Sequence, residues 1–177
     1  MKRAAFLDRD GVINRKPKEG QYVTRWEEMQ FLPGVAEGIA LLIGAGFYVI
    51  VVSNQRCVAK GLLTVRELDL IHQRMCQELA AAGAVITEVY YCPHETQPPC
   101  SCRKPAPGML LSAARAHEID LTASWMIGDS DIDVEAGKNA GCRTARIVKS
   151  DQVANGSADV LAQSLLLAVH QILLLES

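Results

Sequence analysis

The sequence predicts an α/β fold built on a doubly wound parallel sheet, and three observations lead to this prediction. Short runs rich in β-branched and aromatic residues alternate with longer stretches of helical pattern, which is the chain order of βαβ units. The strand-like runs are apolar at consecutive positions, most clearly over residues 47–52, as in strands that helices cover on both faces. Glycines stand just beyond expected helix ends at Gly46, Gly83 and Gly141.

The expected elements alternate from the N-terminus onward. Five strands are expected, over residues 4–7, 47–53, 85–91, 124–127 and 144–148. Four helices are expected between them, over residues 35–45, 64–82, 107–117 and 132–140. Pro33-Gly34 precedes the first of these helices, and Thr64 with Glu67 forms the pattern of a capping box at the start of the second. The last apolar stretch predicts a packed C-terminal helix over about residues 157–175.

Length and charge limit the class of protein. A chain of 177 residues, 49% hydrophobic and 21% charged, predicts a single globular domain over residues 1–177. The net charge is −2, and the lysines and arginines are scattered, so we expect no nucleic-acid partner and no membrane partner. The apolar stretch near the N-terminus is too short for a signal peptide, and the C-terminal stretch is too short to span a bilayer. We therefore expect a cytoplasmic protein.

Polar side chains follow the ends of several predicted strands. In a parallel α/β sheet, ligands bind beyond the carboxyl ends of the strands, so these positions are the candidates for a functional site. They are Asp8 and Asp10 at the first strand, Ser53, Asn54 and Gln55 at the second, Cys92 and His94 at the third, and Asp129 at the fourth.

Asp8 and Asp10 have the spacing of a catalytic carboxylate pair. Carboxylates two residues apart on an extended segment project to the same side, where a divalent cation would relieve their repulsion. One could attack a phosphorus atom while the other moves a proton. Ser53 could donate a hydrogen bond to a phosphoryl oxygen, and Lys104 could balance the charge that develops there. The alternative is a solvated turn with helix-capping aspartates, but Asp129 at another strand end favours a hard-cation site.

A second cluster combines thiols and one imidazole. Cys92-x-His94 and Cys100-x-Cys102 place three thiolates and one histidine close together, a ligand set that suits tetrahedral zinc. With four protein ligands the zinc would be structural, and it would hold the zinc loop, residues 92–102, next to the basic residues that follow it. Incidental thiols beside a surface histidine, or a redox pair of two cysteines, are the alternatives.

The remaining candidates have simpler explanations. Three histidines in helical stretches have no partner at metal spacing and are expected in packing or surface roles: His72, His117 and His170. Three cysteines are expected to be packing residues: Cys57, Cys76 and Cys142. Lys16 and Lys18 belong either to a solvated loop or to a site for a distal phosphate. Asp131 is expected to cap a helix, and Asp133 to hold the loop before it.

The strand-end motifs resemble those of the haloacid dehalogenase-like phosphohydrolases. FLDRDGVIN is similar to motif I, VVSNQ to motif II, CRKPAPGM to the lysine region of motif III, and MIGDSDIDVEAGKNAG to motif IV. All four occur in the family's order between residues 6 and 141. The combination of DRDGVIN, SNQ and the Cys/His insert resembles the D-glycero-D-manno-heptose 1,7-bisphosphate phosphatases and the related histidinol-phosphate phosphatase domains.

The resemblance implies a Rossmann-like haloacid dehalogenase fold with a minimal cap and a role for each motif residue. Asp8 would be the nucleophile and Asp10 the general acid/base, while Ser53 and Lys104 would hold the transferring phosphoryl group. Mg²⁺ would bind the Asp8 side chain, the Asp10 backbone carbonyl and Asp129. The substrate-binding positions that it implies are Glu19, Gly20, Gln21, Tyr22, Asn54, Gln55, Arg56, Arg103 and Ser130. A basic residue is common in the family where this chain has Ser130.

The implied activity is Mg²⁺-dependent hydrolysis of the C7 phosphate of a heptose bisphosphate, a step in carbohydrate metabolism that supplies lipopolysaccharide precursors. The alternatives are histidinol phosphate or another small phosphomonoester as substrate. A receiver-like signalling module also combines a phosphorylated aspartate, Mg²⁺, a hydroxyl and a lysine, but it would lack Asp10 as an acid. We expect a monomer that acts on a small phosphorylated sugar, although the apolar C-terminal helix could instead close a dimer.

Overall fold

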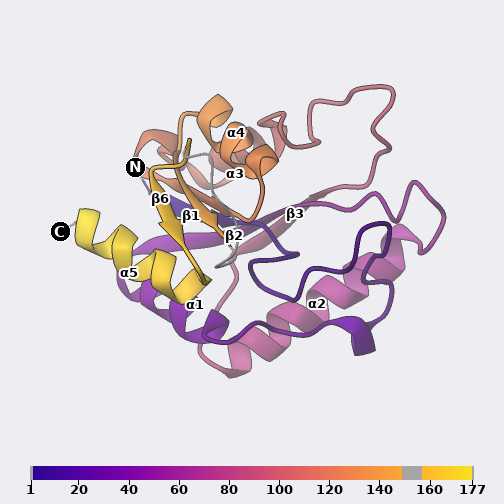
Figure 1. Cartoon of the computed structure of the whole chain (residues 1–177), viewed down its shortest axis with the longest axis horizontal. Coiled ribbons are helices and arrows are strands. Elements are labelled where there is room, and N and C mark those ends of the chain that lie inside the picture. The colour runs from indigo at the N-terminus through magenta and orange to yellow at the C-terminus, as the bar shows by residue number, and fades with distance from the viewer. Residues whose placement is uncertain (1, 149–156, 177) are drawn as a thin grey trace.

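The computed structural model describes residues 2–148 and 157–176, which form a six-stranded parallel sheet between two layers of helices (Figure 1). The strands lie in the order β3-β2-β1-β4-β5-β6, and every neighbouring pair is parallel. Their bounds are β1 Arg3–Leu7, β2 Phe47–Asn54, β3 Glu88–Cys92, β4 Trp125–Gly128, β5 Arg143–Ile147 and β6 Val160–Ala162. Because the chain order reverses between β1 and β4, this is a doubly wound sheet, and the predicted fold class is confirmed.

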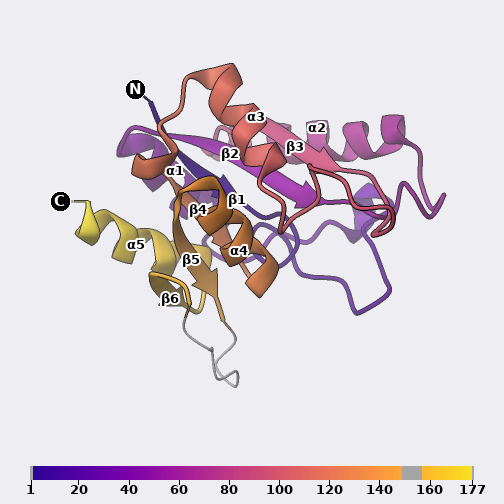
Figure 2. The ribbon, with the colours of Figure 1, turned by 90° about the horizontal axis from the view of Figure 1, so that it is seen from above.

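Five α-helices cover the two faces of the sheet. They are α1 Val35–Gly44, α2 Val65–Ala81, α3 Gly108–His117, α4 Asp131–Ala140 and α5 Leu165–Leu175. Helices α1, α2 and α5 pack on one face, and α3 and α4 pack on the other, as Figures 1 and 2 show. Two short 3₁₀ helices, η1 Trp26–Glu28 and η2 Leu121–Ala123, lie in the connections. None of the described helices is long and apolar enough to cross a membrane.

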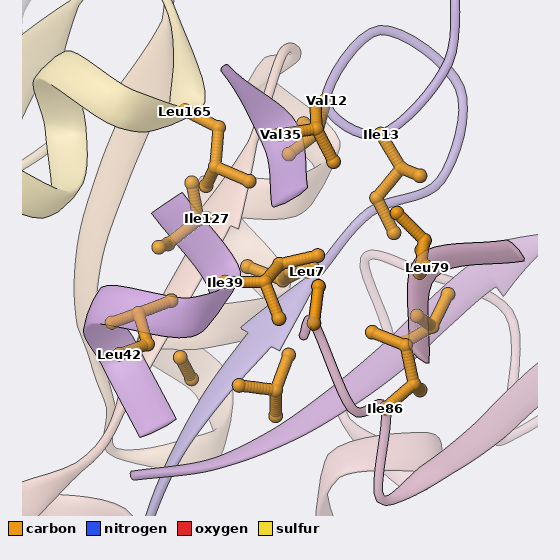
Figure 3. Packing of buried hydrophobic residues seen from close by; sticks show 14 of the residues in the cluster. Leu7, Val12, Ile13, Val35, Ile39, Leu42, Leu79, Ile86, Ile127 and Leu165 are labelled. Carbon is orange, nitrogen blue, oxygen red and sulfur yellow. The ribbon is translucent and has the colours of Figure 1, made fainter. Parts of the chain in front are cut away.

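Alternation along β1 divides the hydrophobic core into two clusters. Ala5 and Leu7 pack toward α1, α2 and α5, whereas Ala4 and Phe6 pack toward α3 and α4. In Figure 3, Leu7 lies among side chains of the first cluster such as Ile39 of α1. All four residues of this run are fully buried, which explains why the strand is apolar at consecutive positions.

The predicted helices and strands occur with boundary shifts of a few residues. The capping box at the start of α2 is present, because the Thr64 hydroxyl accepts from the Glu67 amide and the Glu67 carboxylate accepts from the Thr64 amide. The third strand begins at Glu88 instead of residue 85.

The C-terminal helix is shorter than predicted. Helix α5 begins at Leu165, and Ser164 caps it by accepting from the amide of Leu167 at 3.2 Å. Before it, Val160–Ala162 forms β6 and pairs with β5 at the sheet edge. The expectation of a helix from about residue 157 is therefore wrong for its first part, because one continuous apolar run contains a buried strand and then a helix.

Candidate active site

The carboxyl ends of β1, β2 and β4 converge on a cavity of about 260 Å³. The Asp8 amide donates to the Ile127 carbonyl at 2.9 Å, so the segments that follow β1 and β4 leave the sheet side by side. The lining residues are Asp8, Asp10, Lys16, Pro17, Lys18, Glu19, Gly20, Gln21, Tyr22, Ser53, Asn54, Lys104, Asp129, Ser130, Ile132 and Asp133. The cavity therefore lies at the reversal of strand order, where ligands bind in such sheets.

Lys104 is buried and connects two carboxylates of the cavity. Its Nζ donates to Asp8 Oδ1 at 2.9 Å, to Asp133 Oδ1 at 2.6 Å and to the Val52 carbonyl at 2.7 Å. These contacts use all three protons of the ammonium group. The Lys104 backbone is also held, because its amide and carbonyl form two 3.0 Å hydrogen bonds with the side-chain amide of Asn54.

Burial is the main cause of an unusual charge state at Asp8. It raises the pKa of this carboxyl to about 7, and the nearby charges of Asp133 and Asp10 raise it further, while Lys104 opposes them. Both hydrogen bonds to the carboxylate, from Lys104 and from the Arg9 amide at 2.8 Å, go to Oδ1. Among the described residues, Oδ2 thus remains the oxygen available to a ligand in the cavity.

Asp10 has the opposite tendency, although it is also buried. Burial alone would raise its pKa, but the Arg9 guanidinium and three sets of hydrogen bonds lower it. Arg9 donates to both carboxylate oxygens at 2.9–3.2 Å, Asn14 donates at 2.9 Å and Gln55 at 3.1 Å. Gln55 also donates to the Ser53 hydroxyl at 2.8 Å. The two predicted catalytic carboxylates therefore have clearly different environments.

The described residues include an acidic cluster that could hold a hard cation. Carboxylate oxygens of Asp8, Asp129 and Asp133 lie within 4.8 Å of one another. Both oxygens of Asp133 are engaged, Oδ1 by the buried Lys104 and Oδ2 by Ser130. Asp8 and Asp129 are the better ligands, because Oδ2 of Asp8 is available and Asp129 is held by the exposed Lys16. Gly11 makes room for Asp129, because a Cβ at this residue would collide with the carboxylate and its φ is +96°. The oxygen-rich donor set and the glycine beside it fit Mg²⁺ as the sequence predicts.

Helix α4 begins differently from the expectation. Ser130 is its N-cap, and the Ser130 hydroxyl donates to Asp133 Oδ2 at 2.5 Å. The expectation that Asp131 caps this helix is wrong, because Asp131 instead pairs with Arg146. Asp133 holds the loop as expected, since it binds both the Ser130 amide and the buried Lys104. The Ser130 hydroxyl is thus already engaged, although Ser130 lines the cavity.

The four predicted zinc ligands lie together. Neighbouring Sγ and Nδ1 atoms of Cys92, His94, Cys100 and Cys102 are 3.1–3.5 Å apart, and one ligand atom from each lies within 4.8 Å of all others. Ligand atoms of tetrahedral zinc are separated by roughly 3.8 Å, given Zn–S bonds of about 2.3 Å. The cysteines are not joined as disulfides. This donor set fits Zn²⁺ with all four positions supplied by the protein.

The predicted substrate-binding residues divide into two groups. Those on the cavity wall are Glu19, Gly20, Gln21, Tyr22, Asn54 and Ser130. Three others lie outside the described lining: Gln55 is behind Asp10, Arg56 pairs with Glu95, and Arg103 donates to the His94 carbonyl at 3.3 Å. Their roles in substrate binding stay predictions.

Three residues make contacts at the site that the sequence did not predict. Lys16 Nζ lies 2.7 and 2.9 Å from the two carboxylate oxygens of Asp129, so it binds an acidic residue here. Arg9 pairs with Asp10, and His72 of α2 contacts Arg9. The signal for Arg9 was its place between two aspartates at the end of a buried strand, where an unpaired charge would be costly.

The sheet, the aspartate pair, the buried lysine and the acidic residue after β4 define a haloacid dehalogenase-like hydrolase. A family model described as HAD-hyrolase-like matches residues 101–160. A D-glycero-beta-D-manno-heptose-1,7-bisphosphate 7-phosphatase of Rhodopseudomonas palustris is 43% identical over 78% of this chain and 79% of its own length. The D-glycero-alpha-D-manno-heptose-1,7-bisphosphate 7-phosphatase of Mycobacterium bovis is 37% identical over 88% and 86%.

Solved structures agree with these relatives. A D,D-heptose 1,7-bisphosphate phosphatase from B. bronchiseptica, complexed with magnesium and phosphate, has a TM-score of 0.88 and 33% identity over 100% of both chains. The chain belongs to the family of D-glycero-D-manno-heptose-1,7-bisphosphate 7-phosphatases. The predicted resemblance is therefore confirmed, and the protein is a phosphatase.

Proposed function

We propose that this enzyme removes the C7 phosphate of D-glycero-D-manno-heptose 1,7-bisphosphate through an aspartyl-phosphate on Asp8. The observation that carries the proposal is the asymmetric carboxylate of Asp8, whose Oδ1 is held by Lys104 while Oδ2 remains available to the cavity. The family's relatives that are named for this bisphosphate support the choice of substrate.

The reaction has two balanced steps. In the first, Asp8 Oδ2 attacks the phosphorus atom, the bond between phosphorus and the C7 oxygen breaks, and Asp10 gives a proton to that oxygen. Because the Arg9 guanidinium and the hydrogen bonds around Asp10 lower its pKa, Asp10 must first bind that proton when the anionic substrate enters the cavity. In the second, Asp10 takes a proton from water as the water attacks the aspartyl-phosphate, which releases inorganic phosphate and restores Asp8. Lys104 and Ser53 stabilise the phosphoryl oxygens at both steps.

Mg²⁺ fits the acidic end of the cavity, where Asp8, Asp129 and the Asp10 carbonyl would hold it. When bound, it supplies positive charge that neutralises the phosphate beside an anionic nucleophile. Lys16 must turn away from Asp129 to release the carboxylate for the metal ion. Its side chain is 52% exposed, so it can turn into solvent. The heptose bisphosphate phosphatase structure that contains magnesium and phosphate supports this cofactor.

Zn²⁺ fits the thiol cluster and would serve the loop instead of the chemistry. The zinc loop is linked to its surroundings at two points, by Glu95 to Arg56 and by the His94 carbonyl to Arg103. A metal ion there would hold the loop that contacts these two arginines. Because the ligand set requires reduced thiols, it supports a cytoplasmic location.

The test is a Mg²⁺-dependent phosphate-release assay that compares both anomers of heptose 1,7-bisphosphate with histidinol phosphate. We expect repeated turnover, one phosphate released per bisphosphate, and heptose 1-phosphate as the product. A larger kcat/KM for histidinol phosphate, or heptose 7-phosphate as the product, would refute the proposed substrate. A single retained phosphate without turnover would indicate the receiver-like alternative instead.

A further inference from the structure

Arg9 is a buried arginine between two residues of the cavity wall, Asp8 and Asp10, and the reaction described above gives it no part. Its side chain is 0% exposed. The Nε atom lies 3.2 Å from Asp10 Oδ1, and Nη2 lies 3.1 and 2.9 Å from Oδ1 and Oδ2. Such a two-pronged contact sets the plane of a carboxylate as well as compensating its charge. The orientation of Asp10 therefore depends on the orientation of the Arg9 guanidinium.

His72 holds the opposite edge of that guanidinium. Its Nε2 lies 3.1 Å from Arg9 Nη1. Arginine can only donate, so the imidazole must accept and must carry its proton on Nδ1. Burial, and after it the charge of Arg9, lowers the pKa of His72 to about 3, which keeps the ring neutral at physiological pH. The ring also packs against Tyr91, with centroids 5.3 Å apart.

A histidine at this position is costly for packing alone. The other buried residues of α2 are apolar, namely Leu68, Ile71, Met75 and Leu79. His72 is 4% exposed, and its Nδ1 has no hydrogen-bond partner among the described residues. Burying a donor without a partner has a desolvation cost that leucine would avoid. In the described part of the chain, the polar contact that compensates this cost is the contact with Arg9.

We propose that His72 is a positioning residue that, through Arg9, orients the Asp10 carboxyl for proton transfer to the leaving oxygen. This inference rests on the proposed function and deepens it, because it assigns a residue of α2 to the acid step at Asp10. Two other donors, Asn14 and Gln55, contact Asp10 from its remaining sides. Among the described residues, the contact between His72 and Arg9 links this network to helix α2. Figure 1 shows the position of α2 in the fold.

The experiment compares His72→Leu and His72→Gln with wild type on two substrates. A sugar phosphate needs a proton at its alkoxide leaving group, whereas p-nitrophenyl phosphate leaves as a stable phenolate without one. The measured quantity is kcat/KM, which reports the steps up to departure of the leaving group and excludes hydrolysis of the aspartyl-phosphate. We expect His72→Leu to lower the ratio of sugar-phosphate to aryl-phosphate kcat/KM by about ten-fold, a part of the usual general-acid contribution.

His72→Gln keeps an acceptor near the position of Nε2, so we expect it to restore most of that ratio. Met75→Ala is the matched control, because it removes a buried side chain one turn along α2 that forms none of the described hydrogen bonds of Arg9. It should lower the unfolding midpoint and leave the ratio unchanged. Equal losses of kcat/KM on both substrates in His72→Leu, or no recovery in His72→Gln, would overturn the proposal.

Different measurements test the proposed function and the role of His72, so one can fail without the other. Wild-type hydrolysis of the heptose bisphosphate tests the proposed function by itself. The ratio between alkyl and aryl substrates within each variant tests the role of His72, whichever sugar phosphate the wild-type enzyme prefers. Thermal unfolding of every variant shows that the compared proteins are folded.

Discussion

Asp8 occupies an environment that opposes its own charge, while the proposed attack requires that charge. Burial raises its pKa to about 7, and Asp133 and Asp10 add to this effect, whereas Lys104 opposes it. A carboxylate so poorly solvated is a better nucleophile than one surrounded by water. The cost of burying it is offset by Lys104, which is why these two residues act as one unit.

Asp8→Asn should abolish turnover and leave the fold intact. The amide has nearly the shape of the carboxylate but no anionic oxygen to attack phosphorus, so we expect a loss of at least about 10³-fold in kcat. Phosphate release under multiple turnover measures the effect, and circular dichroism checks the fold. Normal repeated release by this variant would contradict the assignment of Asp8 as nucleophile.

The sequence was sufficient to predict the residues proposed to touch the reacting phosphate, but not the residues that hold them in place. Asp8, Asp10 and Asp129 follow strand ends, a position that is visible from the apolar runs before them. His72 lies on the buried face of a helix, where spacing predicts only packing. Its contact with Arg9 joins residues 63 positions apart, and such a contact depends on how α2 docks, which no local pattern contains.

At the scale of elements, the zinc loop has little apolar surface of its own and depends on its ligands. Its spacer includes Glu95 to Pro99, and these side chains are largely exposed. We expect purified protein to contain about one equivalent of zinc. Cys102→Ser should remove most of it and raise KM, because the loop that holds Arg103 would loosen.

Cys76→Ser is the control for this zinc prediction. Cys76 lies half-buried on α2, outside the ligand cluster, so its replacement should leave the zinc content unchanged. Metal analysis of both variants, prepared without chelators, gives the comparison. Absence of zinc from the wild-type protein would contradict the four-ligand site.

The edge strand β6 is held by an aspartate whose effect depends on pH. Asp159 accepts from the Thr144 amide at 2.7 Å and from its hydroxyl at 2.9 Å. Although burial alone would raise the pKa of Asp159, these hydrogen bonds lower it below the ordinary value of 3.8. Its stabilising effect is therefore present above about pH 4 and is lost as pH falls through the lowered pKa.

Asp159→Asn should lower the free energy of unfolding by about 1 kcal/mol at pH 7, a modest value because the side chain is exposed to solvent. The difference from wild type should shrink as pH falls below about 4, where Asp159 itself becomes protonated. Denaturant unfolding at several pH values measures both effects. A difference that stays constant from pH 7 to pH 3 would show that the charge of Asp159 does not hold β6.

Helices and strands were predicted correctly where the sequence contains a clear boundary signal between one element and the next. Helix α2 has a capping box and a polar face, so its start and type were visible in the sequence. Strand β6 is only three residues long and leads through Ser164 into an apolar helix. Its pairing with β5 decides its conformation. Three apolar residues in front of a longer apolar helix give no strand signal of their own in the sequence.

At the scale of the whole molecule, the candidate active site lies at the carboxyl ends of the strands, and the contacts of the C-terminal helix region with the sheet lie at their amino ends. The cavity lies beyond the carboxyl ends of the strands, where charge is handled by a few local residues in a protein of net charge −2. At the amino ends, Glu176 after α5 binds the first residues of three strands: Arg3 of β1, Trp125 of β4 and Arg143 of β5. The end of the chain thus joins the strands far from the site.

The exposed face of helix α5 bears on the oligomeric state of the protein. Helix α5 buries Leu165, Ala168, Val169 and Ile172 against α1 and the sheet, while Leu167 and Leu174 are exposed. The expected monomer therefore stays a prediction, with a dimer through this exposed face as the alternative. Sedimentation velocity over a range of concentrations distinguishes them, and a concentration-independent species of 19.2 kDa is the expected result.

Glu176→Ala should destabilise the whole fold without changing the chemistry. The Trp125 indole is fully buried and donates to Glu176 at 3.0 Å, and Arg3 donates at 2.8 Å, so the variant leaves a buried donor without its acceptor. We expect a loss of about 1–3 kcal/mol in the free energy of unfolding, and a fall in Tm of about 2–4 °C for each kcal/mol. Because the contact lies at the amino ends of the strands, kcat should remain at the wild-type value.

Exposed Glu135 on α4 provides the control for this prediction, since Glu135→Ala should leave the free energy of unfolding within about 0.5 kcal/mol of wild type. If both variants unfold at the wild-type temperature, the strands are held together at that edge without Glu176.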